Sequence, residues 1–281
     1  MVEMGGTRRA AAMIVASLAI ATGASCSSLA PPKTATGVAP RSLRIAAMVD
    51  GSPIDLYISR PLDPVPGTPL VIFASGDGGW FGAAVGMFET IAAAGYPVIG
   101  ISSRALLHIE RKSGRTVSAE RIAAAYRQII EEGRRALMIE GHGRVILSGW
   151  SRGASMAVML GAHHPEASLA GVVAIGLAGA EDLDVDLDSD EDSDAVTGTV
   201  GPVDTYRLAR SLSVRCAIIQ STGDGYLPAG QARILFGEDT VRRRFYEVPS
   251  SNHRFSGGES AFRQSLRDAV AWVSADEQLQ P

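Results

Sequence analysis

The stretch Val145-Ile-Leu-Ser-Gly-Trp-Ser-Arg-Gly-Ala154 decides the fold of this 281-residue chain. Its first three residues are an apolar run that predicts a buried strand, and residues 154–160 predict a buried helix. Between them lies the pattern G-x-S-x-G, centred on Ser151. A serine in a sharp strand-to-helix turn needs very small neighbours, which explains the two glycines. The stretch predicts a turn that exposes a nucleophilic hydroxyl, although a chain with 31 glycines can also produce this pattern by chance.

The rest of the chain alternates strand-like runs with helical segments. Further strands are predicted at residues 43–49, 54–59, 70–74, 96–102, 169–177, 214–221 and 244–248. Helices are predicted at residues 81–94, 118–140, 205–212, 229–236 and 260–274. This alternation indicates a mostly parallel eight-stranded sheet with helices on both faces. An initial hairpin, followed by the serine turn after the fifth strand, is the order of the α/β-hydrolase fold, and we expect that fold.

Two other residues follow strands where this fold would bring them close to Ser151. Asp224 lies in a Gly-rich turn after one predicted strand, and His253 lies in the loop after the last. Because the carboxyl ends of parallel strands meet at one edge of a sheet, all three should lie together. We assign Ser151 as nucleophile, His253 as general base and acid, and Asp224 as the acid that orients the imidazole.

Alternatives remain for both partners. Asp224 could only shape its own turn, in which case Glu181 or Asp182 is the next candidate acid. The other four histidines fit the role of base less well. His163 and His164 end a predicted helix, and His142 lies in a turn before a strand, at the wrong end. His108 lies in a predicted loop, either as a surface residue or as part of the lining of the site.

Acyl transfer also needs two N–H donors for the oxyanion. One should be the backbone of Arg152, and the other should come from Asp77 in the loop after the third strand. The glycines of that loop would let its backbone approach a substrate closely. A Gly-rich turn without a ligand is the alternative. Candidate substrate-binding residues are Gly76, Gly78, Trp80 and Trp150.

The amino-acid composition excludes several classes of protein function. The chain is 46% hydrophobic and 20% charged, which is typical of a globular protein. Its net charge of -4 argues against non-specific nucleic-acid binding. No P-loop, C-x-x-C pair or H-E-x-x-H motif occurs, so we expect no cofactor and no metal. The two cysteines cannot form a disulfide framework, and Cys216 in an apolar strand is expected to be an inert core residue.

The N-terminus predicts export. Arg8 and Arg9 precede an apolar run at residues 10–23, which is too short to span a membrane and suits a signal peptide over residues 1–25. Cys26 indicates a lipoprotein signal, which would anchor the protein at a membrane. Cleavage near Ala24 is the alternative. Residues 26–41 predict a flexible tether, and residues 42–281 a single domain.

An insertion over residues 181–203, expected to be lid-like, begins with an acidic run. A solvated loop is the default, because no register places glycine and glutamate as a calcium loop requires. The sharper hypothesis is that the aspartates attract a cationic headgroup to the mouth of the site.

Three motifs carry a resemblance. They are Ser75-Gly-Asp-Gly-Gly-Trp80, the serine turn Gly149-Trp-Ser-Arg-Gly-Ala154, and Asn252-His-Arg-Phe255. Together they resemble the AcvB/VirJ family of exported bacterial α/β hydrolases, mainly over residues 70–160, with Arg152 in place of the family's usual aromatic residue. The resemblance implies a periplasmic serine hydrolase that cleaves an ester, such as that of lysyl-phosphatidylglycerol. The alternatives are an esterase or thioesterase for soluble substrates and a non-catalytic binding module. Protein partners are not assigned.

Overall fold

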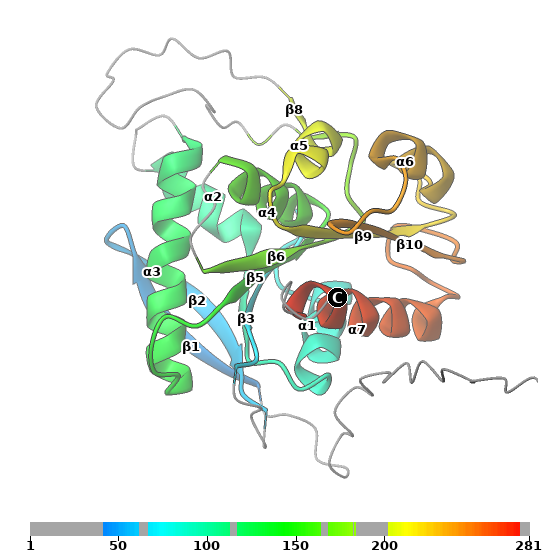
Figure 1. Ribbon diagram of the computed structural model, residues 1–281. Helices are drawn as coiled ribbons and strands as arrows, with labels where there is room; N and C mark the ends of the chain where they lie inside the picture. Colours follow the sequence, from blue (N-terminus) through cyan, green and yellow to red (C-terminus); the bar gives the residue numbers. More distant parts are fainter. Residues whose placement is uncertain are drawn as a thin grey trace, which may run out of the picture. The chain divides into compact units, whose positions relative to one another are not determined.

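The computed structural model describes residues 42–61, 67–112, 117–163, 168–181, 183 and 202–275 (Figure 1). The predicted export signal, Cys26 and the tether lie outside these ranges, as do residues 182 and 184–201 of the acidic insertion. The strands are β1 (Ser42–Val49), β2 (Ser52–Ser59), β3 (Leu70–Ala74), β4 (Val98–Ile101), β5 (Val145–Trp150), β6 (Leu169–Ile175), β7 (Ala180–Glu181), β8 (Val203–Asp204), β9 (Arg215–Ser221) and β10 (Arg243–Val248). The helices are α1 (Ala83–Ala93), α2 (Ser103–Lys112), α3 (Ala119–Leu137), α4 (Arg152–His163), α5 (Thr205–Ser211), α6 (Ala229–Phe236) and α7 (Glu259–Ser274).

Eight strands form one sheet in the order β1-β2-β4-β3-β5-β6-β9-β10. β2 pairs antiparallel with both of its neighbours, and every other pair in this sheet is parallel. Strands β3 and β9 are fully buried, and β5 is buried up to Trp150, as expected for strands covered on both faces of a sheet. The predicted α/β class and the mostly parallel eight-stranded sheet are confirmed.

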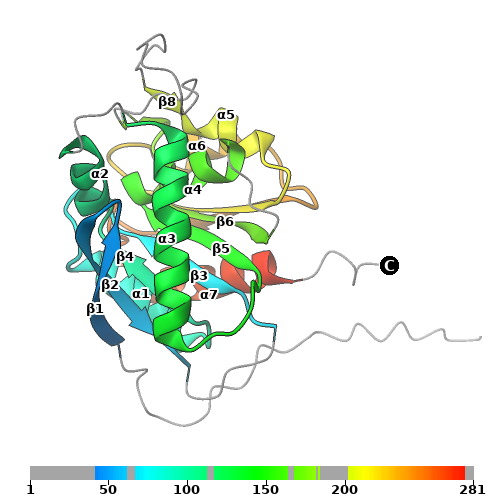
Figure 2. The ribbon, with the colours of Figure 1, turned by 90° about the vertical axis from the view of Figure 1, so that its left-hand side faces the viewer.

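Helices cover both faces of the sheet (Figures 1 and 2). On one face, α1 and α7 pack together over residues such as Val71, Ile146 and Ile219. On the other face, α2 to α6 pack over residues such as Ile72 and Leu147. This arrangement fixes the sheet on both sides and leaves the loops at the carboxyl ends of its parallel strands to form a site.

The structure adds elements that the sequence did not indicate. Helix α2 occupies a polar segment for which no element was predicted, and it buries Leu106, Leu107 and Glu110. Glu110 is buried because its carboxylate pairs with Arg121 of α3 at 2.8 Å. His108 therefore lies on a helix and not in a loop, as was expected, and its side chain is exposed. The short antiparallel pair β7–β8 closes the ends of the acidic insertion.

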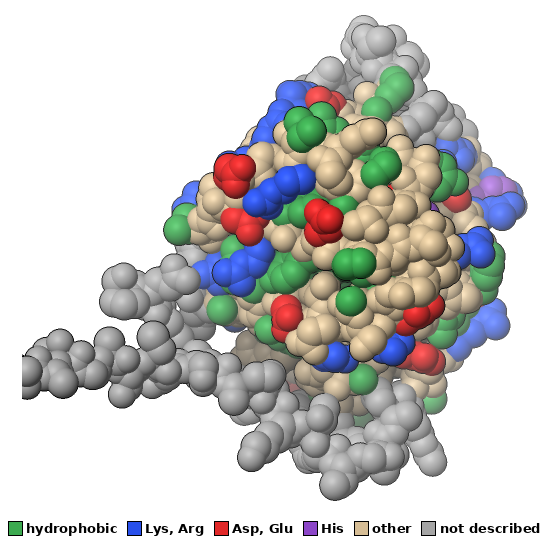
Figure 3. Space-filling model, turned by 90° about the vertical axis from the view of Figure 1, so that its right-hand side faces the viewer, with side chains coloured by type: hydrophobic (Ala, Val, Ile, Leu, Met, Phe, Trp, Pro, Cys, Tyr) green, Lys and Arg blue, Asp and Glu red, His purple; other side chains and the backbone are tan. Residues whose placement is uncertain are grey.

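The described surface has a mixed character. On the face shown in Figure 3, acidic and basic side chains are interspersed among apolar and uncharged ones. Among the described residues, no helix is both long enough and apolar enough to cross a membrane.

Candidate active site

Ser151 lies in a tight turn between β5 and α4. Its φ angle is 56°, a left-handed conformation that a serine adopts only where its surroundings enforce it. The turn is held by two backbone hydrogen bonds, from the Ser151 N–H to Ile175 O at 2.9 Å and from the Ala154 N–H to Ser151 O at 2.8 Å. A Cβ atom on Gly149 would lie 2.3 Å from the Gly153 carbonyl carbon, and one on Gly153 would lie 2.2 Å from Ala74 O. Both glycines of the motif are therefore required by sterics.

The structure brings His253 and Asp224 together. The His253 Nδ1 atom lies 2.7 Å from Asp224 Oδ2, and Asp224 is only 1% exposed. The second ring nitrogen, Nε2, is buried and has no hydrogen-bond partner among the described residues. A carboxylate at Nδ1 favours the tautomer that leaves Nε2 unprotonated, which is the form that can accept a proton.

A small network fixes the Asp224 carboxylate. Its Oδ1 accepts a hydrogen bond from the Tyr226 N–H at 2.9 Å, and its Oδ2 accepts one from Gln220 Nε2 at 3.1 Å. Gln220 itself is buried, and its amide also binds Leu177 N and Leu227 O. Burial, followed by the nearby Asp224 carboxylate, raises the pKa of the Tyr206 phenol, so Tyr206 stays neutral and donates to Leu177 O. The hydrogen bonds from Gln220 and from the Tyr226 N–H thus orient the carboxylate of Asp224 toward His253.

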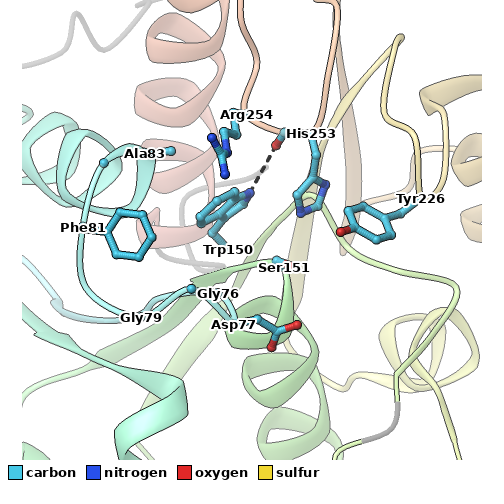
Figure 4. Close-up of a pocket in the computed structure, with 12 residues that line it drawn as sticks. Gly76, Asp77, Gly79, Phe81, Ala83, Trp150, Ser151, Tyr226, His253 and Arg254 are labelled. Carbon is cyan, nitrogen blue, oxygen red and sulfur yellow. Dashed lines mark hydrogen bonds between the residues drawn. The ribbon is translucent and has the colours of Figure 1, made fainter.

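Aromatic rings flank the imidazole on two sides (Figure 4). The Trp150 ring lies 5.4 Å from the His253 ring, and the Tyr226 ring lies 4.9 Å from it at an interplanar angle of 70°. The Trp150 indole N–H donates to the His253 backbone carbonyl at 3.2 Å. Gly176 leaves room for the ring, since a Cβ atom there would lie 2.8 Å from His253 Cε1. His253 is therefore positioned by its ring contacts and by its backbone.

The loop after β3 lies beside the serine turn. A Cβ atom on Gly76 would lie 3.2 Å from Ser151 Cβ, so the loop backbone passes close to the nucleophile. Gly76 and Gly78, both predicted to bind substrate, line the same pocket as Ser151 and His253, as do Asp77 and Trp150.

Trp80 is placed differently from the sequence prediction. It is not among the residues that line this pocket. Its ring stacks on Tyr57 at 4.2 Å and packs edge-on against Phe88, in the core under the loop. The ring lies directly on the backbone of Gly100, where a Cβ atom would be 1.9 Å away. Trp80 therefore packs beneath the loop and connects it to the core, and it does not line the pocket.

Arg152 connects three parts of the site. Its Nε atom lies 2.6 Å from Asp77 Oδ1 in the loop after β3 and 3.1 Å from Glu181 Oε1 in β7. Of the two acids weighed against Asp224, Glu181 is thus paired with an arginine, and Asp182 lies outside the described residues.

The pocket at Ser151 has a volume of about 230 Å³, below the usual range for drug-sized ligands of about 300 to 1,000 Å³. Phe81, Tyr226 and Arg254 also line it, and the sequence analysis did not single them out. Arg254 follows His253 directly and Tyr226 lies two residues after Asp224, so proximity in sequence to these two residues was the available signal. Gln220 was also missed, although a polar residue inside an apolar strand is a detectable signal.

Solved structures with this fold include three relatives of low sequence identity. The esterase domain of a Rhodothermus marinus protein aligns with a TM-score of 0.55 and 14% identity, covering 83% of this chain and 98% of that one. A dienelactone hydrolase from Anabaena variabilis gives 0.52 and 17%, covering 84% and 97%. An α/β serine hydrolase homologue from Coxiella burnetii gives 0.56 and 12%, covering 83% and 99%. These likenesses establish the fold.

No curated protein matches this chain in sequence. Residues 68–191 match the family model described as "Bacterial virulence protein (VirJ)". This range contains the loop after β3, the serine turn and the first residues of the acidic insertion. The resemblance seen in the sequence is therefore confirmed over this range, and the chain carries a VirJ-type segment within an α/β-hydrolase fold.

Proposed function

We propose that this protein is a serine hydrolase that cleaves an ester through a Ser151-His253-Asp224 triad. The observation that carries the proposal is the 2.7 Å contact between His253 Nδ1 and the buried Asp224, in the pocket that also contains Ser151. A buried carboxylate on Nδ1 stabilises the imidazolium that forms when Nε2 takes a proton. The left-handed Ser151 turn supports the same assignment, because strain of this kind gathers at reactive sites.

The proposed reaction has two steps. Ser151 Oγ attacks the ester carbonyl carbon while His253 Nε2 accepts its proton, and His253 then passes that proton to the departing alcohol. Water, activated by the same nitrogen, hydrolyses the acyl-enzyme and restores Ser151. The oxyanion formed in each step would receive hydrogen bonds from the N–H groups of Asp77 and Arg152. Arg152 is the first residue of α4, where backbone N–H groups have no partner within the helix.

For the substrate we propose an aminoacyl ester of phosphatidylglycerol, with the lysyl ester as the first candidate. The reason for this choice is the resemblance of the serine turn and of the loop after β3 to the AcvB/VirJ family, for which such an ester is the implied substrate. The lining of the pocket agrees with it, since it contains the aromatic side chains of Phe81 and Tyr226, and an aromatic ring can bind an ammonium group. A simple soluble ester is the second candidate, because the pocket is small and an esterase domain shares the fold.

The test offers both substrates to the same preparations. Release of lysine from vesicles containing lysyl-phosphatidylglycerol is measured beside hydrolysis of p-nitrophenyl butyrate. Ser151→Ala should abolish both activities, since loss of a triad serine costs about 10⁶ in kcat. Ser155→Ala is the matched control, because this serine lies one turn further along α4 and its hydroxyl has no hydrogen-bond partner among the described residues. Activity on the butyrate alone would remove the lipid substrate, and no Ser151-dependent activity would leave a binding module.

Asp224→Asn tests the acid. The amide keeps the shape of the side chain but favours the wrong imidazole tautomer, so kcat should fall by about 10⁴. Glu181→Gln is the comparison, because Glu181 contacts Arg152 and was the alternative acid. A larger loss of kcat in Glu181→Gln than in Asp224→Asn would reverse the assignment.

We also propose export through residues 1–25, with lipid attachment at Cys26. The basic residues before a short apolar run and the cysteine after it support this proposal. Expression of the full chain in a Gram-negative host, with metabolic labelling by a fatty-acid analogue, should label wild type and leave Cys26→Ser unlabelled. No labelling of wild type would favour cleavage near Ala24, and equal labelling of wild type and Cys26→Ser would show that the lipid is attached at a residue other than Cys26.

A further inference from the structure

Asp77 and Arg152 share a proposed role in this site and also contact each other directly. In the mechanism proposed above, on which this inference rests, each gives one backbone N–H to the oxyanion. Their side chains also pair with each other, with Arg152 Nε lying 2.6 Å from Asp77 Oδ1. The residues that would supply the two halves of the oxyanion hole are therefore joined by an ion pair.

The backbone of Arg152 is fixed by packing, whereas the backbone of Asp77 depends more on the ion pair. Arg152 begins α4, which packs on β5 and β6, and the closely packed Gly149 and Gly153 leave its position no freedom. Asp77 lies in a loop with glycine at positions 76, 78, 79 and 82, and two of these adopt positive φ angles of 91° and 56°. Glycine permits many backbone conformations, so the sequence of this loop does not by itself fix where the Asp77 N–H points.

A second carboxylate steadies the guanidinium. Glu181 Oε1 lies 3.1 Å from the same Nε atom, and the side chains of Arg152 and Glu181 are 24% and 13% exposed. The Asp77 side chain is 59% exposed, so it has fewer packing contacts than its partners in this cluster. The partly buried Arg152–Glu181 pair thus offers a fixed point to which the exposed Asp77 can attach.

We propose that the Arg152 side chain is a positioning residue, which fixes the loop after β3 so that the Asp77 N–H meets the oxyanion. The role acts in the transition state, because the oxyanion forms only there. It differs from a substrate contact, which would act on KM.

A purely electrostatic role makes the opposite prediction for Asp77. If Arg152 only neutralised a carboxylate near the oxyanion, Asp77→Asn would remove the unfavourable charge and raise kcat. If the ion pair positions the loop, Asp77→Asn breaks it and lowers kcat. The sign of the change therefore separates the two roles.

The kinetic test uses Arg152→Met, Arg152→Lys, Asp77→Asn and the double variant Arg152→Met/Asp77→Asn, all of which keep both backbone N–H groups. We expect Arg152→Met and Asp77→Asn each to lower kcat about tenfold with little change in KM, less than the roughly 10² to 10³ lost with a whole oxyanion donor. Arg152→Lys should recover part of the loss, and the double variant should be no worse than either single one. A rise in kcat for Asp77→Asn, or a change confined to KM, would overturn the proposal.

A second readout does not depend on activity. Amide hydrogen exchange of the peptide containing residues 75–82 should become faster in Arg152→Met and stay unchanged in Ser151→Ala. Arg135→Met is the matched control, because it breaks an exposed ion pair of 2.6 Å with Glu132 within α3. Unchanged exchange in Arg152→Met would refute the positioning role, whatever the activity. If wild type lacks Ser151-dependent hydrolysis, the proposed function fails while the exchange experiment still decides whether Arg152 holds the loop.

Discussion

The serine turn and the loop after β3 are both Gly-rich turns at the carboxyl ends of adjacent parallel strands, yet they are held in different ways. At the serine turn, Cβ atoms at Gly149 and Gly153 would lie 2.3 and 2.2 Å from backbone atoms, so the packing of the main chain sets the geometry. In the loop, a Cβ atom at Gly78 would touch only the Phe81 ring, at 3.0 Å. Gly76 at the start of the loop packs against Ser151, but beyond it two side chains add most of the contacts, Trp80 from the core and Asp77 through its ion pair.

The serine turn is therefore fixed by the fold itself, whereas the position of the loop after β3 depends on individual side chains. A nucleophile whose position depends on backbone sterics can change only if the sheet changes. The part of the loop after Gly76, whose side-chain contacts are one ring and one ion pair, can shift with single substitutions. The variants below act on one region at a time.

Replacing one glycine in each region should give the largest contrast. Gly149→Ala forces a methyl group into the backbone of residue 153 and should lower the free energy of unfolding by about 3 kcal/mol. Gly78→Ala should change it by less than about 0.5 kcal/mol, because the exposed Phe81 ring can move aside. Urea denaturation of both variants measures these changes. Similar losses in the two would show that the loop is as tightly packed as the serine turn.

Removing the anchor of the loop should have the next largest effect. Trp80→Ala should lower the free energy of unfolding by about 2 kcal/mol, less than for a fully buried tryptophan, and should lower kcat because Asp77 follows the loop. The matched control is Trp272→Ala on α7, a half-buried tryptophan that contacts Arg215 and Arg244. It should lose stability without losing kcat. Retention of full kcat by folded Trp80→Ala would show that Trp80 does not position the loop.

A smaller effect on kcat is expected from weakening the contact between Trp150 in the serine turn and the loop that contains His253. Trp150→Phe keeps an aromatic ring beside His253 but removes the indole N–H that donates to its carbonyl at 3.2 Å. One such hydrogen bond contributes about 1 kcal/mol, so kcat should fall about fivefold. Steady-state kinetics measure the change, with Trp272→Phe as control. A fall of a hundredfold or more would mean that Trp150 contacts the substrate as well.

The smallest effect is expected at Cys216 in β9, away from both regions. Burial raises the pKa of this thiol from 9.0 to about 12, so only about one molecule in ten thousand carries the reactive thiolate at pH 8. Iodoacetamide should leave the Cys216 peptide unmodified in the folded protein and alkylate it in urea, as mass spectrometry can show. The raised pKa also makes the free energy of unfolding depend on pH. Above about pH 9 the thiol ionises in the unfolded protein but not in the folded one, so the free energy of unfolding falls as the pH rises further. Rapid alkylation of folded protein at pH 8 would contradict the buried assignment.

The sequence predicted the parallel core well because its buried strands are short apolar runs bounded by turn signals, and helices of 7 to 23 residues were predicted between them. The run Leu70–Ala74, for example, was predicted with the bounds that β3 has. Helix α2 was missed because its buried face contains Glu110, whose partner Arg121 lies on another helix and is not visible in a local pattern.

Within the site, order along the chain was sufficient to predict that Asp224 and His253 would lie together. It was not sufficient for Trp80, because the choice between pocket and core depends on Tyr57 and Gly100, which are distant in sequence. The link between Arg152 and Asp77 was not predictable for the same reason.

The most direct test of the central claim is covalent labelling with a fluorophosphonate followed by peptide mass spectrometry. The account predicts one adduct, on Ser151, in wild type and in Ser155→Ala. It predicts no adduct in Ser151→Ala and much slower labelling in Asp224→Asn, because His253 is then a poorer base. An adduct on another residue, or equal labelling of Ser151→Ala and wild type, would contradict the claim that Ser151 is the nucleophile.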